Sequence, residues 1–190
     1  MSDKLTDGVA AHSGLPVAVL SGGCFWCLDA VYRELRGVRE VTCGYMGGHL
    51  PAPDYEAVCS GTSGHAEVVR IVFDPVQISF RDLLEVFFVI HDPTQLNRQG
   101  NDVGTQYRSA IFWLDEAQRN EAAQALTGLA GAFAVPVVTE LSPATLFHPA
   151  EDYHQDYYRQ HPGQGYCAYV VAPKLAKFRT KFVSLLKQDA

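Results

Sequence analysis

Short apolar runs alternate along this chain with longer segments in which apolar residues recur every three or four positions. Residues 17–20 are continuously apolar, as in a buried strand. The segment that follows places apolar side chains on one helical face, at Phe25, Leu28, Val31 and Leu35. The pattern therefore predicts a strand and a helix joined by a turn over residues 21–24.

The same patterns predict the remaining elements. Strands are expected over residues 38–45, 65–73, 107–114 and 134–141, and helices over 83–91, 115–129, 147–160 and 174–188. Ser79 and Asp82 are spaced as a helix cap. The order strand–helix–strand–strand–helix–strand over residues 17–114 is that of a ferredoxin-like, two-layer α/β sandwich (βαββαβ), here with extra helices. We expect residues 1–15 to form a flexible arm and residues 16–190 a single domain.

Composition narrows the classes of protein to consider. The chain has 190 residues and a net charge of −6, which gives no electrostatic case for nucleic acid or an anionic membrane. The longest apolar run, residues 86–90, is too short to span a bilayer. Residues 1–13 lack the basic and apolar pattern of a signal peptide. Five cysteines do not suggest a secreted disulfide framework, so we expect a reducing, cytoplasmic location.

Cys24 is the best nucleophile candidate. It follows Gly22 and Gly23, which allow a tight turn, and it stands at the start of the first predicted helix. A helix N-terminus carries partial positive charge, which should lower the pKa of the thiol and favour the thiolate. The alternative is that Cys24 is a small buried apolar residue.

Glu67 is the candidate general acid. It shares one face of a predicted strand with Val69, Ile71 and Phe73. An apolar face would desolvate the carboxylate and raise its pKa, so that the neutral acid could donate a proton. The alternative is a half-exposed strand with Glu67 at its solvated end.

Polar and aromatic residues in two loops are further candidates. Asp102 and Tyr107 lie in or beside the long polar loop 92–106, and loops of this length are uncommon without a function. Tyr55 lies in the loop before the predicted strand 65–73. Tyrosine hydroxyls can bind a polar substrate oxygen while their rings line a pocket. The alternative is that all three are ordinary surface residues.

The remaining cysteines offer several roles. Cys24 and Cys27 form a C-x-x-C, which suits a redox pair or half of a zinc site. No second pair follows at zinc spacing, so we expect no metal. Cys167 follows the glycine-rich residues 163–165, where a mobile thiol could resolve an oxidised Cys24. Cys43 and Cys59 adjoin apolar residues and are expected to be inert.

Several motifs together resemble one family, the peptide methionine sulfoxide reductases of the A type. The resemblance covers about residues 16–185 and rests on Gly23-Cys24-Phe25-Trp26, Gly44-Tyr45, Gly47-Gly48, Tyr55, Gly64-His65-Ala66-Glu67, Gln99-Gly100-Asn101-Asp102, Gly104-Thr105-Gln106-Tyr107-Arg108-Ser109 and Glu151-x-Tyr153-His154-Gln155. It implies an α/β fold around the Gly-Cys-Phe-Trp turn. It also implies thiol-dependent reduction of methionine-S-sulfoxide, free or in proteins, as a repair of oxidative damage.

The resemblance also implies roles for individual residues. Cys24 matches the nucleophile, and Glu67 matches the acid that protonates the sulfoxide oxygen. Tyr55 and Tyr107 match the hydroxyls that bind this oxygen, supported by Asp102. The apolar wall for the substrate methyl group matches Phe25 and Trp26, and the resolving thiol matches Cys167.

Three residues depart from the family pattern. Cys27 stands where many members have Gly, and it leaves open whether Cys27 or Cys167 resolves the oxidised Cys24, with Cys167 favoured. Asp29 stands where many members have Glu, which keeps a carboxylate but shortens its reach. Cys43 also departs, without an evident consequence.

The expected cycle needs no resident cofactor and no metal. Cys24 becomes a sulfenic acid, a disulfide forms within the chain, and thioredoxin or a similar dithiol reduces it. We expect a monomer with no nucleic-acid or membrane partner. The alternatives are a general thiol–disulfide oxidoreductase that uses Cys24 and Cys27, and a non-catalytic aromatic cage.

Overall fold

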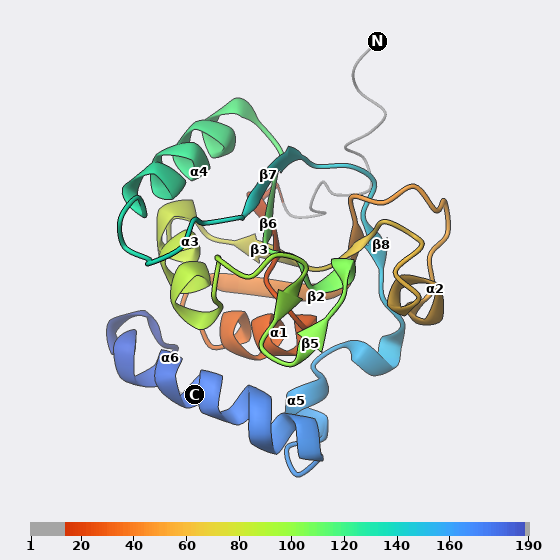
Figure 1. The fold of residues 1–190 in the computed structure, drawn as a ribbon. Helices are drawn as coiled ribbons and strands as arrows, with labels where there is room; N and C mark the ends of the chain where they lie inside the picture. The colour runs from red at the N-terminus through yellow and green to blue at the C-terminus, as the bar shows by residue number, and fades with distance from the viewer. Residues whose placement is uncertain (1–13, 189–190) are drawn as a thin grey trace.

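The computed structural model describes residues 14–188, which form a central six-stranded sheet with helices packed on it (Figure 1). Most of the arm expected over residues 1–15 lies outside the described residues. The strands are β1 (Val17–Ser21), β2 (Val38–Met46), β3 (Ala66–Phe73), β6 (Ala110–Trp113), β7 (Glu140–Pro143) and β8 (His148–Pro149). Their order across the sheet is β7-β6-β1-β3-β2-β8.

The four inner strands have the predicted ferredoxin-like arrangement. β6, β1, β3 and β2 are neighbours in that order, and each pairs antiparallel with the next. Helices α1 (Phe25–Arg33) and α3 (Phe80–Ile90) form the two crossovers. β7 adds to β6 in parallel and β8 adds to β2 antiparallel, so the core is extended at both edges. The predicted fold class is confirmed.

The other elements surround this core. They are the helices α2 (Tyr55–Cys59), α4 (Glu116–Gly128), α5 (Tyr157–Gln160) and α6 (Ala172–Lys181), the small hairpin β4 (Arg98–Gln99) with β5 (Asp102–Val103), the short turns η1 (Thr105–Tyr107), η2 (Asp152–His154) and η4 (Val183–Leu185), and the π-helical turn η3 (Cys167–Val171). α5, η3 and α6 all pack against α1, at the lower part of Figure 1.

Strand β3 is buried along its whole length, on both faces. Val69 and Ile71 belong to the cluster packed against α1 and α3, and Val68 and Val72 belong to a second cluster on the other face, against Phe147. Side chains alternate between the faces of a strand, so Glu67 shares the face of Val69 and Ile71. The alternative of a half-exposed Glu67 is therefore wrong, since the residue is 1% exposed.

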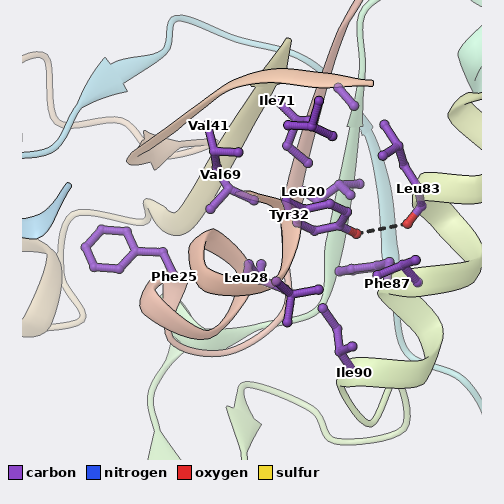
Figure 2. Packing of buried hydrophobic residues seen from close by; sticks show 14 of the residues in the cluster. Leu20, Phe25, Leu28, Tyr32, Val41, Val69, Ile71, Leu83, Phe87 and Ile90 are labelled. Carbon is purple, nitrogen blue, oxygen red and sulfur yellow. Dashed lines mark hydrogen bonds between the residues drawn. The ribbon is translucent and has the colours of Figure 1, made fainter. Parts of the chain in front are cut away.

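The main core lies between the sheet and the helices α1 and α3 (Figure 2). Leu20 and Val69 from the sheet, Leu28 from α1 and Phe87 from α3 all point into it. The fully buried Tyr32 donates a hydrogen bond from its hydroxyl to the backbone oxygen of Leu83, 2.9 Å away. This bond satisfies the polar end of an otherwise apolar ring and sets α1 against α3.

Some element boundaries differ from the sequence prediction. The capping box of Ser79 and Asp82 is confirmed and begins α3. The helix expected over residues 147–160 is instead β8, η2 and α5, because Pro149 pairs at the sheet edge and Asp156 has a left-handed φ of 53°. The strand expected over residues 134–141 is the shorter β7, which begins at Glu140 and ends at Pro143. The C-terminal helix ends at Lys181, and the segment after it pairs with the residues that follow α1, where Leu35 bridges Leu186 and the Arg36 N–H donates to the backbone oxygen of Leu185.

Candidate active site

Cys24 is the N-cap residue of α1, as the turn motif predicts. Gly23 before it has a φ of +88°, a value that L side chains rarely adopt, and a Cβ there would lie 2.7 Å from Cγ of Gln99. A Cβ on Gly22 would lie 2.8 Å from the ring of Phe87. Both glycines are therefore required for the turn to pack closely against its neighbours. The Cys24 side chain is 7% exposed.

The carboxyl group of Glu67 lies at this same helix end. Its Oε2 accepts a hydrogen bond from the backbone N–H of Phe25, 3.0 Å away. Burial, opposed by this hydrogen bond and assisted by the charge of Asp102, raises the pKa of Glu67 to about 8. Glu67 is therefore a protonated acid at neutral pH, next to the residue that follows Cys24.

The prediction that the helix end lowers the pKa of Cys24 is wrong. Burial is the largest influence, and together with the charges of Glu67 and Cys27 it raises the pKa well above the usual value. The backbone N–H of Trp26 and the hydroxyl of Tyr166 act in the opposite direction but do not compensate. Cys24 therefore rests as a thiol, and its proton must leave when substrate binds.

The hairpin β4–β5 brings Asp102 to the site. Gln99 fixes this hairpin, because its side-chain amide accepts from the backbone N–H of Asp92 at 3.0 Å and donates to the backbone oxygen of Asp92 at 3.1 Å. Asp102 accepts a hydrogen bond from the hydroxyl of Tyr166, 2.5 Å away. The alternative that Asp102 is an ordinary surface residue is therefore not supported.

Tyr55 and Tyr107 reach the same region from two different segments. Tyr55 is the first residue of α2, and Tyr107 ends η1, directly before Arg108 and the start of β6. Burial raises the pKa of both tyrosines, and the negative charge of Glu67 raises each further. Both hydroxyls are therefore protonated donors close to the acid.

Glu151 holds this part of the site in place. Its two carboxylate oxygens accept hydrogen bonds from the Tyr45 hydroxyl and from the backbone N–H of Tyr55, both at 2.8 Å. Glu151 lies far along the chain, between β8 and η2. It thus fixes the start of α2 relative to strand β2.

Phe25 and Trp26 contact aromatic residues from the C-terminal third of the chain. Trp26 stacks on Tyr157 with ring centroids 3.9 Å apart and planes 6° apart, and its indole N–H donates to Nδ1 of His154 at 3.2 Å. Phe25 is 1% exposed and lies against His154, with centroids 5.0 Å apart. Trp26 is partly exposed, so of the two it offers more surface to a ligand.

Asp29 and Cys43 have structural contacts. Both oxygens of the buried Asp29 accept hydrogen bonds from Nε of Arg33 at 2.9 Å, and Arg33 also donates to the backbone oxygen of Val41 at 2.7 Å. Burial raises the pKa of Asp29 to about 6 despite this partner. The Cys43 thiol faces the backbone oxygen of Phe25 at 4.0 Å. These contacts fasten α1 to β2.

The remaining thiols lie in three different elements, Cys27 in α1, Cys59 in α2 and Cys167 in η3. All five cysteines are among the described residues, and none is in a disulfide. Cys27 is 2% exposed and receives a hydrogen bond from Nζ of Lys174 at 3.6 Å. Cys167 is fully buried in η3, rather than in the loop expected after residues 163–165. The exposed Cys59 lies in α2, where its thiol raises the pKa of the Tyr55 hydroxyl.

Several residues at the site were not singled out by sequence reasoning. Glu151 and His154 belong to the Glu151-x-Tyr153-His154-Gln155 motif, which was a signal without an assigned role. Tyr157, Tyr166 and Lys174 gave no signal, because their importance comes from contacts with residues more than 60 positions away.

Metal and membrane features are also described by the structure. Within residues 14–188, no group of three or more His, Cys, Asp or Glu side chains could hold a metal ion. Over the same residues, no helix is long and apolar enough to cross a membrane.

Comparison with known proteins agrees with this geometry. The family model for peptide methionine sulfoxide reductase matches residues 16–186. The peptide methionine sulfoxide reductase MsrA of Polynucleobacter asymbioticus is 59% identical over 171 residues, which cover 89% of this chain and 90% of that protein. The chain belongs to the peptide methionine sulfoxide reductase family.

Solved structures lead to the same assignment. Reduced Mxr1 from Saccharomyces cerevisiae has a TM-score of 0.77 at 31% identity, covering 85% of this chain and 94% of that chain. Methionine sulfoxide reductase A of Corynebacterium diphtheriae has a TM-score of 0.74 at 36% identity, covering 84% of this chain and 80% of that chain. The protein is thus an oxidoreductase of the A type that reduces methionine sulfoxide, which decides against the aromatic-cage and general oxidoreductase alternatives.

Proposed function

We propose that Cys24 reduces methionine-S-sulfoxide by direct attack on the sulfoxide sulfur, with Glu67 as the acid. The observation that carries this proposal is the hydrogen bond between Glu67 and the backbone N–H of Phe25 at 3.0 Å. It holds a protonated carboxyl beside the nucleophile, in a buried site where charge interactions are strong.

The first step transfers one oxygen from methionine sulfoxide to Cys24 and moves two protons. The Glu67 proton goes to the sulfoxide oxygen while the Cys24 thiolate attacks the sulfur, and the thiol proton of Cys24 restores Glu67. The attack forms a bond between the two sulfur atoms, and the S–O bond of the substrate then breaks and releases hydroxide. Hydroxide adds to the Cys24 sulfur as the S–S bond breaks, so that methionine leaves and Cys24 becomes a sulfenic acid. Methionine sulfoxide is thereby reduced by two electrons and the cysteine is oxidised by two.

The substrate oxygen and methyl group need separate contacts. We assign the hydroxyls of Tyr55 and Tyr107 to the oxygen, with Asp102 as support for the hydrogen-bond network. The indole of Trp26, which stacks on Tyr157, and the ring of Phe25 are assigned to the methyl group, since a flat apolar surface suits it. A substrate presented by a protein or as the free amino acid can satisfy these contacts.

The cycle closes through a disulfide. A second thiol of the chain, Cys27 or Cys167, condenses with the sulfenic acid and releases water, and an external dithiol reduces the product. Mxr1, which is 31% identical to this chain, has also been solved in complex with Trx2. This complex of a relative supports a thioredoxin as the physiological dithiol here.

The experiment is a single turnover without reductant. The purified enzyme is mixed with excess S epimer of a methionine sulfoxide peptide, and released methionine and cysteine oxidation are followed by mass spectrometry. One equivalent of methionine with oxidation at Cys24 supports the proposal. No sulfoxide-dependent methionine release, or release with Cys24 unmodified throughout, would overturn it.

A further inference from the structure

We propose that Cys27, activated by Lys174, is the first thiol to resolve oxidised Cys24, and that Cys27 then passes the disulfide to Cys167. This inference rests on the proposed sulfenic acid at Cys24. It assigns a positioning role to Lys174 and reverses the sequence-based preference for Cys167 in the first step.

Cys27 is placed to reach Cys24. The two residues occupy the first turn of α1, where the backbone N–H of Cys27 donates to the backbone oxygen of Cys24 at 3.1 Å. A hydrogen bond from the hydroxyl of Tyr166 lowers the pKa of both thiols, and the charges of both sulfurs raise the pKa of Tyr166. The Tyr166 hydroxyl therefore lies beside both sulfurs. Cys-x-x-Cys at a helix start can close a disulfide with little backbone movement.

Lys174 provides a positive charge where the surroundings are apolar. Its Nζ lies 3.6 Å from Sγ of Cys27, whose other neighbours in a small buried cluster are Ala30, Cys167 and Val171. None of the ion pairs among residues 14–188 includes Lys174, so no carboxylate of these residues forms a salt bridge with its ammonium group. The ammonium group is therefore available to stabilise a thiolate at Cys27.

Other groups also act on Cys27. Burial is the largest influence and, with the charge of Asp102, raises the pKa of the Cys27 thiol above its usual value, while Lys174 and the hydroxyl of Tyr166 act in the opposite direction and limit this rise. Lys174 lines one pocket with the titratable residues His91, Asp92, Lys177 and Lys181. Burial lowers the pKa of His91 to about 4, so this imidazole is neutral near pH 7. Lys174 is thus the cation that limits the rise in the pKa of Cys27, and its removal should raise this pKa further.

Cys167 is placed to act second. It shares the buried cluster with Cys27, where η3 packs on α1, and it lacks a neighbouring cation, so burial raises the pKa of its thiol. Cys24 belongs instead to the main core cluster between the sheet and helices α1 and α3, and Cys27 adjoins it through the first turn of α1. The geometry therefore connects Cys24 to Cys27 and Cys27 to Cys167.

The steps balance without a further oxidant. The Cys27 thiolate attacks the sulfenic sulfur of Cys24, the S–O bond breaks, and hydroxide leaves as water with one proton. The Cys167 thiolate then attacks the Cys27 sulfur and releases Cys24 as a thiolate, which takes up a proton. An external dithiol finally reduces the Cys27–Cys167 disulfide.

The first experiment maps disulfides after one turnover without reductant. We expect Cys27–Cys167 in the wild type and Cys24–Cys27 in Cys167→Ser. In Cys27→Ser we expect one equivalent of methionine and a persistent sulfenic acid at Cys24, detected with dimedone. A Cys24–Cys167 disulfide forming in Cys27→Ser at the wild-type rate would overturn the inference. Absence of methionine release in the wild type would instead reject the proposed function.

The second experiment tests Lys174 through Lys174→Met. Methionine release in a single turnover should be unchanged, while disulfide formation at pH 7 should slow roughly tenfold, the effect of about one unit in the pKa of Cys27. The rate should recover at higher pH. Lys181→Met removes an exposed charge from the same helix and is the control. Wild-type disulfide formation in Lys174→Met, at every pH, would remove Lys174 from the mechanism.

Discussion

Oε2 of Glu67, on strand β3, accepts a hydrogen bond from the backbone N–H of Phe25, on helix α1, at 3.0 Å across 42 positions of sequence. The bond satisfies one of the free N–H groups at the helix start and fixes the carboxyl group beside Cys24. Burial of the carboxyl group outweighs the opposing effect of this hydrogen bond and raises the pKa of Glu67 to about 8, so the acid stays protonated at neutral pH. One contact thereby orders the acid and the nucleophile.

Glu67→Gln should slow methionine release in a single turnover by roughly 10²- to 10⁴-fold, the usual contribution of a positioned acid. The amide can keep the hydrogen bond from Phe25, so substrate affinity should change little. Quench-flow measurement of released methionine gives the rate. Glu85→Gln, an exposed change on α3, is the control. Wild-type release by Glu67→Gln would exclude Glu67 as the acid.

The raised pKa of Glu67 also predicts how stability depends on pH. The group titrates near 4.5 when unfolded and near 8 when folded, so between these values the folded state binds more protons. Its contribution to the free energy of unfolding therefore falls as pH rises, by at most about 1.4 kcal/mol per pH unit. Glu67→Gln should gain stability relative to the wild type between pH 5 and pH 8, measured by urea denaturation. A constant difference over this range would contradict the assignment.

Cys24→Ser should abolish sulfoxide reduction and leave the fold intact, because a hydroxyl is a much weaker nucleophile than a thiolate. Methionine release and the thermal unfolding midpoint are the two measurements. Serine fits the N-cap position that Cys24 occupies, so no loss of helix α1 is expected. A folded variant with wild-type turnover would show that another group attacks the sulfoxide.

Tyr166→Phe should raise the pKa of Cys24 further, since the hydroxyl of Tyr166 lowers it in the wild type. The pH profile of iodoacetamide labelling at Cys24 reports this pKa directly. We expect its inflection to move to higher pH and methionine release at pH 7 to slow roughly tenfold, as for one pKa unit. Tyr169→Phe, at a ring that is 85% exposed, is the matched control. An unchanged labelling profile in Tyr166→Phe would refute this role.

Gly23→Ala should destabilise the protein by roughly 2 kcal/mol or more, through a left-handed backbone and a close approach to Gln99. Gly131→Ala is a useful comparison, because Gly131 also has a positive φ, +80°, but no atom lies within 4 Å of the added Cβ. The difference between the two variants in urea denaturation isolates the contact with Gln99. Equal losses would mean that the Gly23 turn has room for a side chain.

The order of strands and helices was predictable from the sequence because it depends on local periodicity. The apolar run of β1, the apolar residues of β3 and the capping box of Ser79 all lie within a few residues of the elements they specify. The same local reading placed Cys24 at the start of α1. It was less successful over residues 147–160, where pairing at a distant sheet edge and the left-handed Asp156 override helical spacing.

The properties of the site depend on the tertiary structure. A sequence places Cys24 at a helix end, where the local field favours a thiolate, but only the packed core reveals the burial that outweighs this field and raises the pKa. The proximity of Glu67 to Phe25 and of Lys174 to Cys27 joins segments 42 and 147 positions apart. Desolvation and charge act through space, so the chain order fixes which groups are present and the fold alone decides which protons they hold.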